Sequence, residues 1–362
     1  MEEEAVMNVQ MNLSRNLKDK PADESKLGFG HIFTDHMLMI NYTDGKGWHD
    51  ARIVPYGNLS LDPACQVLHY GQEIFEGLKC YRTPQGGFNL FRPRANFERF
   101  ARSAERMGMA PLPVEDGLET LMALLDVEKE WTPHQEGTSL YIRPTMIATD
   151  NHLGVSTSST YLYYVILSPS GAYYASGLAP VGIYVEDSYV RAVRGGIGFA
   201  KTGGNYAASI LAGMNAKHSG YAQVLWLDGV HQRYIEEVGA MNMMFVYEDR
   251  KIVTPVLNGS ILPGITRDSV LKLGKHLGYE TEEARMDIHD VIADIKAGRV
   301  TEAFGTGTAA VVSPVNKIRF QGEEIGIGDG GIGHITQQLY DVLTGIQFGK
   351  TDDPMGWVVH LK

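Results

Sequence analysis

The order of the strand and helix patterns restricts the fold of this chain more than any other feature. In the first half, short apolar runs typical of strands come in groups, and two amphipathic helical patterns follow each other directly. This order differs from the regular βαβ alternation of a barrel or a doubly wound sheet. The strands expected in this half lie at residues 37–42, 51–55, 88–91, 141–145 and 161–167, and the helices at 94–109 and 118–125.

A break rich in Ser, Pro and Gly divides the chain near its middle. Ser168-Pro169-Ser170-Gly171 and the following residues to Gly177 have the composition of a linker. At roughly 150 residues per domain, 362 residues are enough for two domains. We therefore expect a two-domain α/β protein of the α+β type, with a loose N-terminal arm at 1–30, a smaller domain at 31–170, a linker at 171–179 and a larger domain at 180–362. In the larger domain, strands are expected at 182–185, 224–227 and 243–247, and helices at 205–217, 267–277, 289–297 and 334–343.

The charge balance and the cysteine count exclude several classes of protein. The 32 basic and 43 acidic residues give a net charge of −11, which is unfavourable for binding a nucleic-acid backbone. No run approaches the roughly 18 apolar residues of a membrane span. Cys65 and Cys80 are too few for a disulfide framework or a cysteine-rich zinc site. With an acidic start at Met1–Glu4 that opposes a signal peptide, we expect a cytoplasmic protein that binds neither nucleic acid nor membrane.

Two glycine motifs resemble nucleotide-binding loops but lack the required context. The segment 195–205 nearly spells a P-loop, yet Ala200 stands immediately before Lys201-Thr202, where that motif needs Gly. Gly326–Gly331 fits G-x-G-x-x-G, but only 31 residues follow it, too few for a full crossover and the acidic residue beyond it. An ATPase that uses Lys201 as a phosphate lysine is therefore the weaker alternative. The motifs H-E-x-x-H and G-x-S-x-G do not occur, so we expect neither a metal site nor a serine hydrolase.

Lys201 is enclosed by glycines and by the apolar pair Phe199-Ala200. Glycines let a flat ligand approach the backbone closely. An apolar setting lowers the pKa of a lysine and makes its amine nucleophilic, as Schiff-base chemistry requires. By residue type alone, a surface lysine in a flexible loop is the more common explanation.

Three further segments have one functional and one purely structural explanation each. Glu236-Glu237 precede a glycine, and because neighbours in a strand face opposite sides, we expect one carboxylate in solvent and the other turned inward. The inward carboxylate would pair with a protonated pyridine nitrogen or form a structural ion pair. Residues 262–267 open a helix whose N-terminus could bind an anion or carry a simple cap. Residues 305–309 form either an anion-binding turn or an ordinary tight turn.

Taken together, a glycine-flanked lysine, a carboxylate, a helix N-terminus and a Gly-Thr turn suit pyridoxal phosphate. The chain resembles the branched-chain amino acid aminotransferases, whose lysine-bearing domain has the type IV fold of pyridoxal phosphate enzymes, with a barrel-like β core. The likeness runs from about Phe29 to Leu361 and is greatest to the longer branch that includes the animal enzymes. Its motifs, in order and at matching spacing, are Phe75-Glu76-Gly77-Leu78-Lys79, Phe91-Arg92-Pro93, Tyr141-Ile142-Arg143-Pro144, Gly203-Gly204-Asn205-Tyr206-Ala207, Glu237-Val238-Gly239 and Leu262-Pro263-Gly264-Ile265-Thr266-Arg267.

The resemblance implies a role for each residue that contacts the cofactor. Lys201 is expected to form the Schiff base with pyridoxal phosphate and to move the proton between the substrate Cα and the cofactor C4′. Glu237 is expected to keep the pyridine nitrogen protonated, and Tyr206 to hydrogen-bond the ring 3′-oxygen. The residues expected to bind the phosphate are Arg99, Ile265, Thr266 and Thr308.

The same resemblance implies a pocket that accepts a branched aliphatic side chain in one half-reaction and glutamate in the other. Aromatic and aliphatic walls suit the first substrate, and Arg143 with tyrosine hydroxyls can pair with the γ-carboxylate of the second. The amides of Thr308 and Ala309 are expected to face the α-carboxylate. The expected side-chain pocket consists of Phe75, Tyr141, Arg143, Tyr173, Ala240 and Met241.

The implied activity is reversible ping-pong transfer of the amino group of L-leucine, L-isoleucine or L-valine to 2-oxoglutarate. In the family, Tyr70, Leu153 and Val155 enter the pocket from the neighbouring subunit, so the resemblance implies a homodimer. The alternatives with the same fold are a D-amino acid aminotransferase and an aminodeoxychorismate lyase. A non-catalytic protein that binds pyridoxal phosphate is a further alternative. Such a protein would not need the complete set of residues for proton transfer, namely Arg99, Lys201, Tyr206 and Glu237.

Two positions depart from the family pattern. The animal enzymes carry a C-x-x-C redox pair after the Thr-Ala turn, whereas this chain has Ala310 and Ser313 there. We therefore expect no thiol switch at this turn. Ala240 replaces the threonine expected beside Met241, which widens the pocket or removes one hydroxyl contact.

Overall fold

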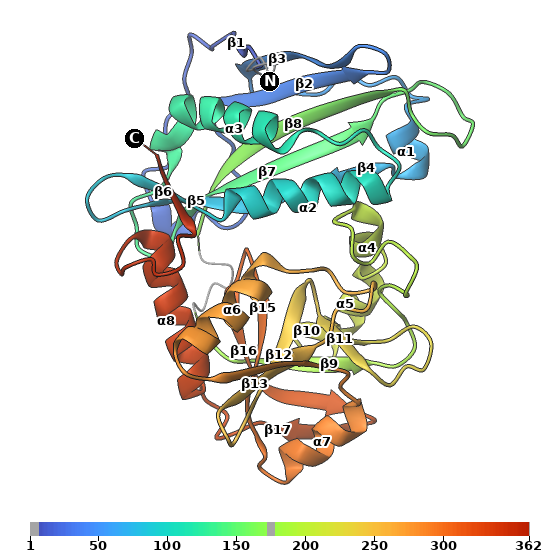
Figure 1. Ribbon diagram of the computed structural model, residues 1–362, viewed down its shortest axis with the longest axis vertical. Helices are drawn as coiled ribbons and strands as arrows, with labels where there is room; N and C mark the ends of the chain where they lie inside the picture. The colour runs from blue at the N-terminus through green and yellow to red at the C-terminus, as the bar shows by residue number, and fades with distance from the viewer. Residues whose placement is uncertain (1–6, 172–177, 362) are drawn as a thin grey trace, which may run out of the picture. The chain divides into compact units, whose positions relative to one another are not determined.

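The computed structural model describes residues 7–171 and 178–361. They form two compact units, each with its own sheet (Figure 1). Among the described residues, unit 1 contains 7–171, Ala200–Gly203 and 347–361, and unit 2 contains 178–199 and 204–346. The predicted boundaries place the whole C-terminal region in the larger domain. The last strand, β18 (Val358–Leu361), instead pairs with β6 (Phe88–Phe91) of unit 1.

Unit 1 is built on a sheet with nine strands in the described part of the chain. The strand order is β1-β3-β2-β8-β7-β5-β6-β18, β4 pairs with β7, and all pairings are antiparallel except the parallel pair β1–β3. Strands β7 and β8 pair continuously from Ser139↔Ser170 to Ala148↔Tyr161. The remaining bounds are β1 (Gln10–Met11), β2 (His36–Thr43), β3 (Gly47–Pro55), β4 (Glu73–Phe75), β5 (Leu78–Arg82), β7 (Ser139–Ala148) and β8 (Thr160–Ser170).

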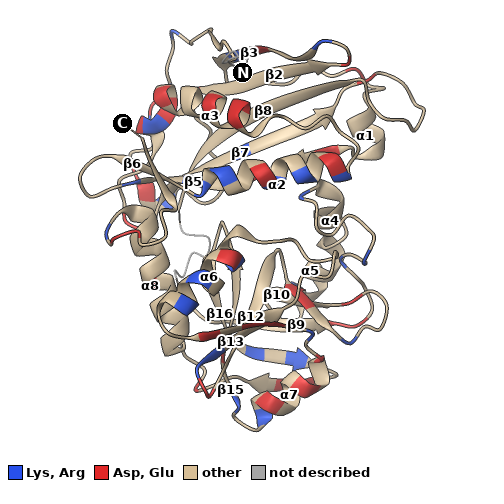
Figure 2. Cartoon of the chain, viewed as in Figure 1, with Lys and Arg blue, Asp and Glu red and all other residues tan. Residues whose placement is uncertain are grey.

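Helices α2 (Pro93–Arg106) and α3 (Val114–Glu128) supply the helical layer of unit 1. Pro93 occupies the first turn of α2, where its missing N–H costs nothing. Phe97 and Phe100 pack with the sheet in one core, and the absent side chain of Gly117 lets α3 approach the Phe97 ring. Helix α2 carries both Arg and Glu residues, whereas the charged residues of α3 are all Asp or Glu (Figure 2). The short helices of this unit are η1 (Glu24–Lys26), α1 (Gln66–Tyr70) and η2 (Lys129–Trp131).

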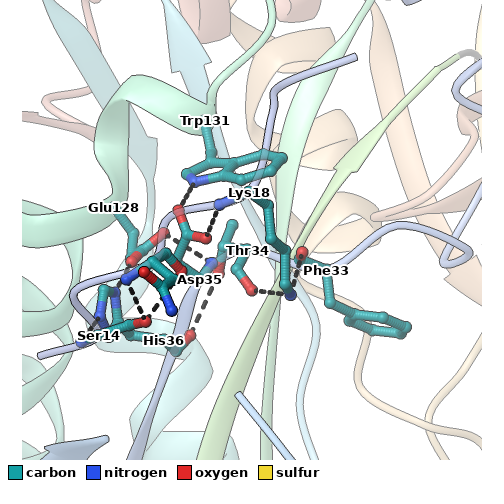
Figure 3. A network of polar contacts seen from close by, with 9 residues as sticks. Ser14, Lys18, Phe33, Thr34, Asp35, His36, Glu128 and Trp131 are labelled. Atoms are coloured by element: carbon teal, nitrogen blue, oxygen red, sulfur yellow. Dashed lines mark hydrogen bonds and ion pairs between the residues drawn. The ribbon is translucent and has the colours of Figure 1, made fainter. Parts of the chain in front are cut away.

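The described part of the N-terminal arm is attached to unit 1, so the prediction of a loose arm is wrong for these residues. Besides the β1–β3 pairing, a buried polar network binds the arm (Figure 3). The Ser14 N–H donates to Nε2 of His36 at 2.9 Å, and the Lys18 N–H donates to Oδ1 of Asp35 at 2.7 Å. Because Nε2 of His36 accepts a hydrogen bond, the ring proton is on Nδ1. This N–H donates a hydrogen bond to Glu128. Trp131 Nε1 donates to the other oxygen of Asp35 at 3.0 Å.

Unit 2 is built on a second sheet of nine strands within the described residues, part of which closes on itself. The order is β11-β10-β9-β16-β15-β12-β13-β14, and β17 pairs with β16. An additional pairing between β11 and β12 joins the two sides, so six strands form a closed, barrel-like ring that confirms the predicted core. The bounds are β9 (Val181–Glu186), β10 (Gln223–Leu227), β11 (Ile235–Val238), β12 (Met241–Tyr247), β13 (Lys251–Pro255), β14 (Glu280–Ala284), β15 (Val300–Gly307), β16 (Val311–Phe320) and β17 (Glu323–Gly326).

Helices cover parts of this second sheet. Helix α7 (Ile288–Lys296) buries four apolar side chains in the sheet core, and α5 (Ile210–His218) packs Ala212 and Ala216 near Trp226. The other helices are α4 (Gly203–Ala207), α6 (Ile265–His276) and α8 (His334–Phe348). In the described ranges, no helix has the length and apolar character that a bilayer crossing requires.

The helix expected at 205–217 is divided into α4 and α5. The Ser209 hydroxyl donates to the Tyr206 carbonyl at 2.7 Å, and the Ser209 N–H bonds the same carbonyl at 3.0 Å. A side chain that competes for a backbone acceptor favours a turn over a continuous helix. The strands not predicted include β11, because its sequence Ile-Glu-Glu-Val does not alternate between polar and apolar residues.

The carboxylate of Asp228 organises the loop that leads into β11. The sequence predicts a tight Asp-Gly hairpin here, but β10 and β11 are joined by a longer loop. Asp228 accepts hydrogen bonds from four backbone N–H groups, those of Val230, His231, Arg233 and Tyr234, at 2.7–3.1 Å. Burial opposes ionisation, but these donors lower the pKa of Asp228 below its usual value.

We expect Asp228→Asn to lower the free energy of unfolding by about 2 kcal/mol near pH 7, because a neutral amide accepts fewer and weaker hydrogen bonds. Since the folded-state pKa is lowered, the contribution of the carboxylate is present above its unfolded pKa of about 3.9 and is lost as the pH falls through the folded value. The free energies of unfolding of wild type and variant, measured with urea, should therefore become equal as the pH is lowered. The exposed neighbour variant Asp187→Asn is the control, and an Asp228→Asn protein as stable as wild type at neutral pH would contradict the role.

Candidate active site

Lys201 belongs to unit 1, where backbone hydrogen bonds hold its segment against β4 and α2. Its N–H donates to the Ser103 hydroxyl at 2.9 Å, and its carbonyl accepts the Phe75 N–H at 3.0 Å. The Lys201 amine lies 4.8 Å from the centre of the Phe75 ring. The alternative of a lysine in a flexible surface loop is therefore wrong. The sequence did not indicate a role for Ser103, because no local motif links it to a lysine 98 positions away.

Glu73 fixes the other end of this segment. The Gly203 N–H donates to its carboxylate, and a Cβ at Gly203 would overlap that carboxylate. The absence of a side chain at Gly203 thus lets the two segments approach closely without moving the Glu73 carboxylate. Burial raises the pKa of Glu73, and the Gly203 N–H and the charge of Arg143 oppose that rise.

Arg99 lies on α2 and forms a buried, two-pronged ion pair with Glu76. Nε and Nη2 of Arg99 donate to the two carboxylate oxygens at 2.7 and 2.9 Å, and Asn96 donates to the same carboxylate at 2.7 Å. Burial alone would raise the pKa of Glu76, but the charges of Arg99 and Lys201 and the hydrogen bonds lower it. The phosphate role of Arg99 remains a prediction, and Glu76 is its unpredicted partner.

Three residues of the predicted substrate pocket contact one another in unit 1. Nη2 of Arg143 donates to the Tyr141 hydroxyl at 3.2 Å, and the Arg143 guanidinium lies 4.8 Å from the centre of the Phe75 ring. A Cβ at Gly77 would overlap the Tyr141 hydroxyl, which explains the glycine in the motif 75–79. Two aromatic rings and a cation thus meet beside Lys201. Tyr173 lies outside the described residues.

The residues expected to serve a neighbouring subunit lie on the surface of unit 1. Tyr70, Leu153 and Val155 are 43%, 65% and 83% exposed, and the Tyr70 hydroxyl donates to the Leu153 carbonyl at 2.6 Å. Leu68, also on α1, is 59% exposed. A folded chain seldom exposes several large apolar side chains together without a use for them.

Glu237 lies in unit 2, where it is held as a buried carboxylate. One oxygen accepts the Leu262 N–H at 2.7 Å, and the other lies 3.1 Å from Nε of Arg191. The expectation that one of Glu236 and Glu237 faces solvent is wrong, because both are at most 3% exposed. Strand β11 is part of the closed ring, and Asn258 and Ser260 cover the carboxylate of Glu236. Sequence reasoning missed Arg191, which carries no recognisable motif.

The N-terminus of α6 contains the predicted phosphate-binding residues of unit 2. The residue at the cap position, Gly264, has no side chain to cap the helix, and it lies so close to Asn242 that a Cβ would overlap the amide. Ile265 and Thr266 form its first turn, and Thr266 is buried. A helix N-terminus of this kind favours an anion through its N–H groups and its dipole. Tyr206, on α4, is half-buried.

The turn between β15 and β16 contains Thr308 and Ala309. It ends at Val311, whose φ of 61° is in the left-handed region that β-branched residues avoid. Backbone strain of this kind is concentrated at ligand-binding sites. Gly305 and Gly307 leave room for the Met241 side chain, which lies 3.0–3.2 Å from where their Cβ atoms would stand. Ala240 and Met241 are thus placed beside the Gly-Thr turn.

These features fit a phosphorylated pyridine cofactor. A buried carboxylate beside an arginine suits the ring nitrogen, and the N-terminus of α6, which begins at a glycine cap, suits the phosphate. In addition, the Thr306 hydroxyl is buried and has no hydrogen-bond partner among the described residues. Such a group is costly unless a ligand or water satisfies it.

Comparisons with known proteins agree with this chemistry. The chain matches the amino-transferase class IV family over residues 73–318, more than half of its length. A probable branched-chain-amino-acid aminotransferase from Staphylococcus aureus (strain MRSA252) is 55% identical over 352 residues, which are 97% of this chain and 98% of that protein. The chain belongs to the branched-chain aminotransferases of class IV.

Two solved structures confirm the predicted fold of this class IV aminotransferase. The branched-chain amino acid aminotransferase of Escherichia coli aligns with a TM-score of 0.74 at 29% identity, covering 88% of this chain and 98% of that one. The T.th. branched-chain amino acid aminotransferase in complex with N-(5′-phosphopyridoxyl)-L-glutamate aligns with a TM-score of 0.73 at 28% identity, covering 89% of this chain and 97% of that one. The resemblance predicted from the motifs is therefore confirmed.

Proposed function

We propose that this class IV aminotransferase transfers the amino group of L-leucine, L-isoleucine and L-valine to 2-oxoglutarate, in reversible ping-pong half-reactions. Pyridoxal phosphate supplies an electron-accepting ring that stabilises negative charge at the substrate Cα. The observation that carries the proposal is the buried carboxylate of Glu237 beside Arg191. A carboxylate at this position, when ionised, would keep the pyridine nitrogen of the cofactor protonated.

Lys201 is the residue to which we assign proton transfer. Its amine holds the cofactor and takes the proton from the substrate Cα. The amine lies 4.8 Å from the centre of the Phe75 ring, a residue of the predicted substrate pocket. The residues that we assign to the cofactor are Arg99, Lys201, Tyr206, Glu237, Ile265, Thr266 and Thr308.

The substrate pocket must accept both an aliphatic side chain and a carboxylate. We assign the aliphatic contacts to Phe75, Tyr141, Ala240 and Met241, whose surfaces are largely apolar. Arg143 hydrogen-bonds Tyr141 and lies against Phe75, so a cation is already held among these aromatic rings. Arg143 and the Tyr141 hydroxyl therefore bind the γ-carboxylate of glutamate, and the Thr308 and Ala309 amides bind the α-carboxylate.

We also propose that the enzyme is a homodimer in the cytoplasm. The exposed group of Tyr70, Leu153 and Val155 supports the dimer, in which these residues complete the pocket of the partner. Both cysteines are free, which agrees with a reducing compartment. Light scattering of the wild type and of a Leu153→Asp variant would test the assembly.

The visible absorption of the purified protein tests the proposed activity. L-leucine without a keto acid should bleach the band of bound pyridoxal phosphate, and 2-oxoglutarate should restore it. D-leucine should leave the band unchanged, which separates this activity from that of a D-amino acid aminotransferase. A protein that binds the cofactor but does not respond to L-leucine would require another substrate.

Arg143→Met should separate the two half-reactions. We expect kcat/KM for 2-oxoglutarate to fall about 100-fold, because its γ-carboxylate loses a buried cationic partner. The value for L-leucine should change less than about threefold, since methionine keeps an apolar surface. Single-turnover kinetics with each substrate measure both values, and the exposed variant Arg102→Met serves as control. Equal losses for both substrates would rule out this assignment.

A further inference from the structure

We infer that Glu236 is a positioning residue for the cofactor phosphate, an inference that rests on the proposed function. Glu236 lies on β11 next to Glu237, but its carboxylate binds a different part of the chain. One oxygen of Glu236 accepts hydrogen bonds from Nδ2 of Asn258, at 3.0 Å, and from the Ser260 hydroxyl. These two donors belong to the loop 256–264 between β13 and α6. The buried carboxylate therefore anchors the loop that delivers the N-terminus of α6.

The anchored loop is held at successive residues by side chains of unit 2. The Ser260 carbonyl accepts a hydrogen bond from Nη2 of Arg191. The next anchor is Leu262, whose N–H donates to Glu237 at 2.7 Å and whose carbonyl accepts from Asn242 at 2.9 Å. Two residues later, Gly264 is the N-cap of α6. Each anchor thus restricts the path of the backbone into the first turn of this helix.

The two neighbouring carboxylates consequently have different tasks. Glu237 accepts the Leu262 N–H of the loop and lies beside Arg191, and we assign its charge to the ring nitrogen. Glu236 bonds two side chains of the loop and does not need to touch the cofactor. Its charge makes both hydrogen bonds stronger than neutral ones. Glu236 also lines a cavity of about 310 Å³ together with Arg194 and Arg285.

A helix N-terminus binds phosphate well only when its N–H groups are held in the correct direction. Loss of the Glu236 anchor should therefore weaken binding of the phosphate and spare the contacts to the pyridine ring. A change that merely loosened unit 2 would weaken both. Comparison of pyridoxal phosphate with pyridoxal, which lacks the phosphate, separates these cases.

The experiment is to titrate the full-length, cofactor-depleted chain with pyridoxal phosphate and with pyridoxal, following absorbance. For Glu236→Ala we expect the Kd of pyridoxal phosphate to rise about 10- to 100-fold and that of pyridoxal to rise less than about threefold. Glu236→Gln keeps an acceptor oxygen and should restore most of the affinity. Ser260→Ala removes one donor while leaving β11 intact, and should raise the Kd of pyridoxal phosphate about tenfold. The exposed variant Glu248→Ala is the matched control.

Each outcome bears on one of the two claims. The positioning role is supported if Glu236→Ala or Ser260→Ala binds pyridoxal phosphate less preferentially over pyridoxal than wild type does, and if Glu236→Gln recovers that preference. The role is overturned if the preference for pyridoxal phosphate over pyridoxal is unchanged in both variants, including when both ligands lose affinity equally. If Glu236→Ala does not fold, Ser260→Ala decides the question alone. A wild-type chain that binds no pyridoxal phosphate overturns the proposed function instead, and this result is distinct from the others.

Discussion

Lys201→Ala should lower kcat for L-leucine with 2-oxoglutarate by at least about 10⁴-fold. General acid–base catalysis alone contributes about 10²- to 10⁴-fold, and this variant also loses the nucleophilic amine. The fold should remain intact, because the Lys201 segment is held by backbone bonds to Ser103 and Phe75, which the substitution keeps. A coupled assay for glutamate measures the rate, and circular dichroism checks the fold.

The exposed Lys217→Ala is the matched control for this variant, since it removes an amine of the same type from α5. It should retain the wild-type rate within about twofold, as is usual for surface substitutions. Residual activity of Lys201→Ala above about 1% of wild type would exclude Lys201 as the proton-transfer residue. External amines that restore part of the rate would further identify the missing group as an amine.

Glu237→Gln should give the second largest effect, a decrease in kcat of about 10²- to 10³-fold, the cost typical of removing one preorganised electrostatic group. A neutral amide does not keep the pyridine nitrogen protonated, so negative charge at the substrate Cα is less stabilised. The Leu262 N–H can still bond the amide oxygen, so the loop and the affinity for the cofactor should change little.

Stopped-flow measurement of the L-leucine half-reaction tests Glu237→Gln directly. Glu237→Asp, which keeps the charge, should recover part of the rate, and the exposed Glu248→Gln should behave as wild type. A Glu237→Gln enzyme with full kcat and weakened cofactor binding would instead mean that Glu237 serves only to hold the loop.

The residues of this site that could be predicted from the sequence are those that stand in a recognisable local motif. Lys201 and Glu237 stand in distinctive local motifs, and the structure places both in well-defined polar surroundings. Ser103, Glu76 and Arg191 were not assigned, because each acts through a partner far away along the chain. Periodicity and composition carry no information on such pairs. Only the fold brings them into contact.

The errors in the predicted fold also have physical causes. Strand alternation predicts one solvated carboxylate in β11, but that rule assumes that one face of the strand is open, and here a loop covers it. The N-terminal arm has no periodic pattern, yet the two-residue strand β1 and the buried side chains of Asp35 and His36 bind it. Long helices such as α2 and α3 were predicted well because their apolar faces repeat over several turns.

The division of the chain into units has a consequence for anyone who wishes to engineer this enzyme. Unit 1 is assembled from three separate stretches of sequence, so a cut near residue 171 does not release an independent module. Such a fragment would lack both the lysine-bearing tetrapeptide and β18, and β6 would become an unprotected edge prone to aggregate. Split-enzyme reporters and domain-swapped chimaeras of this protein should therefore exchange all three stretches together, or be cut within a surface loop of one unit.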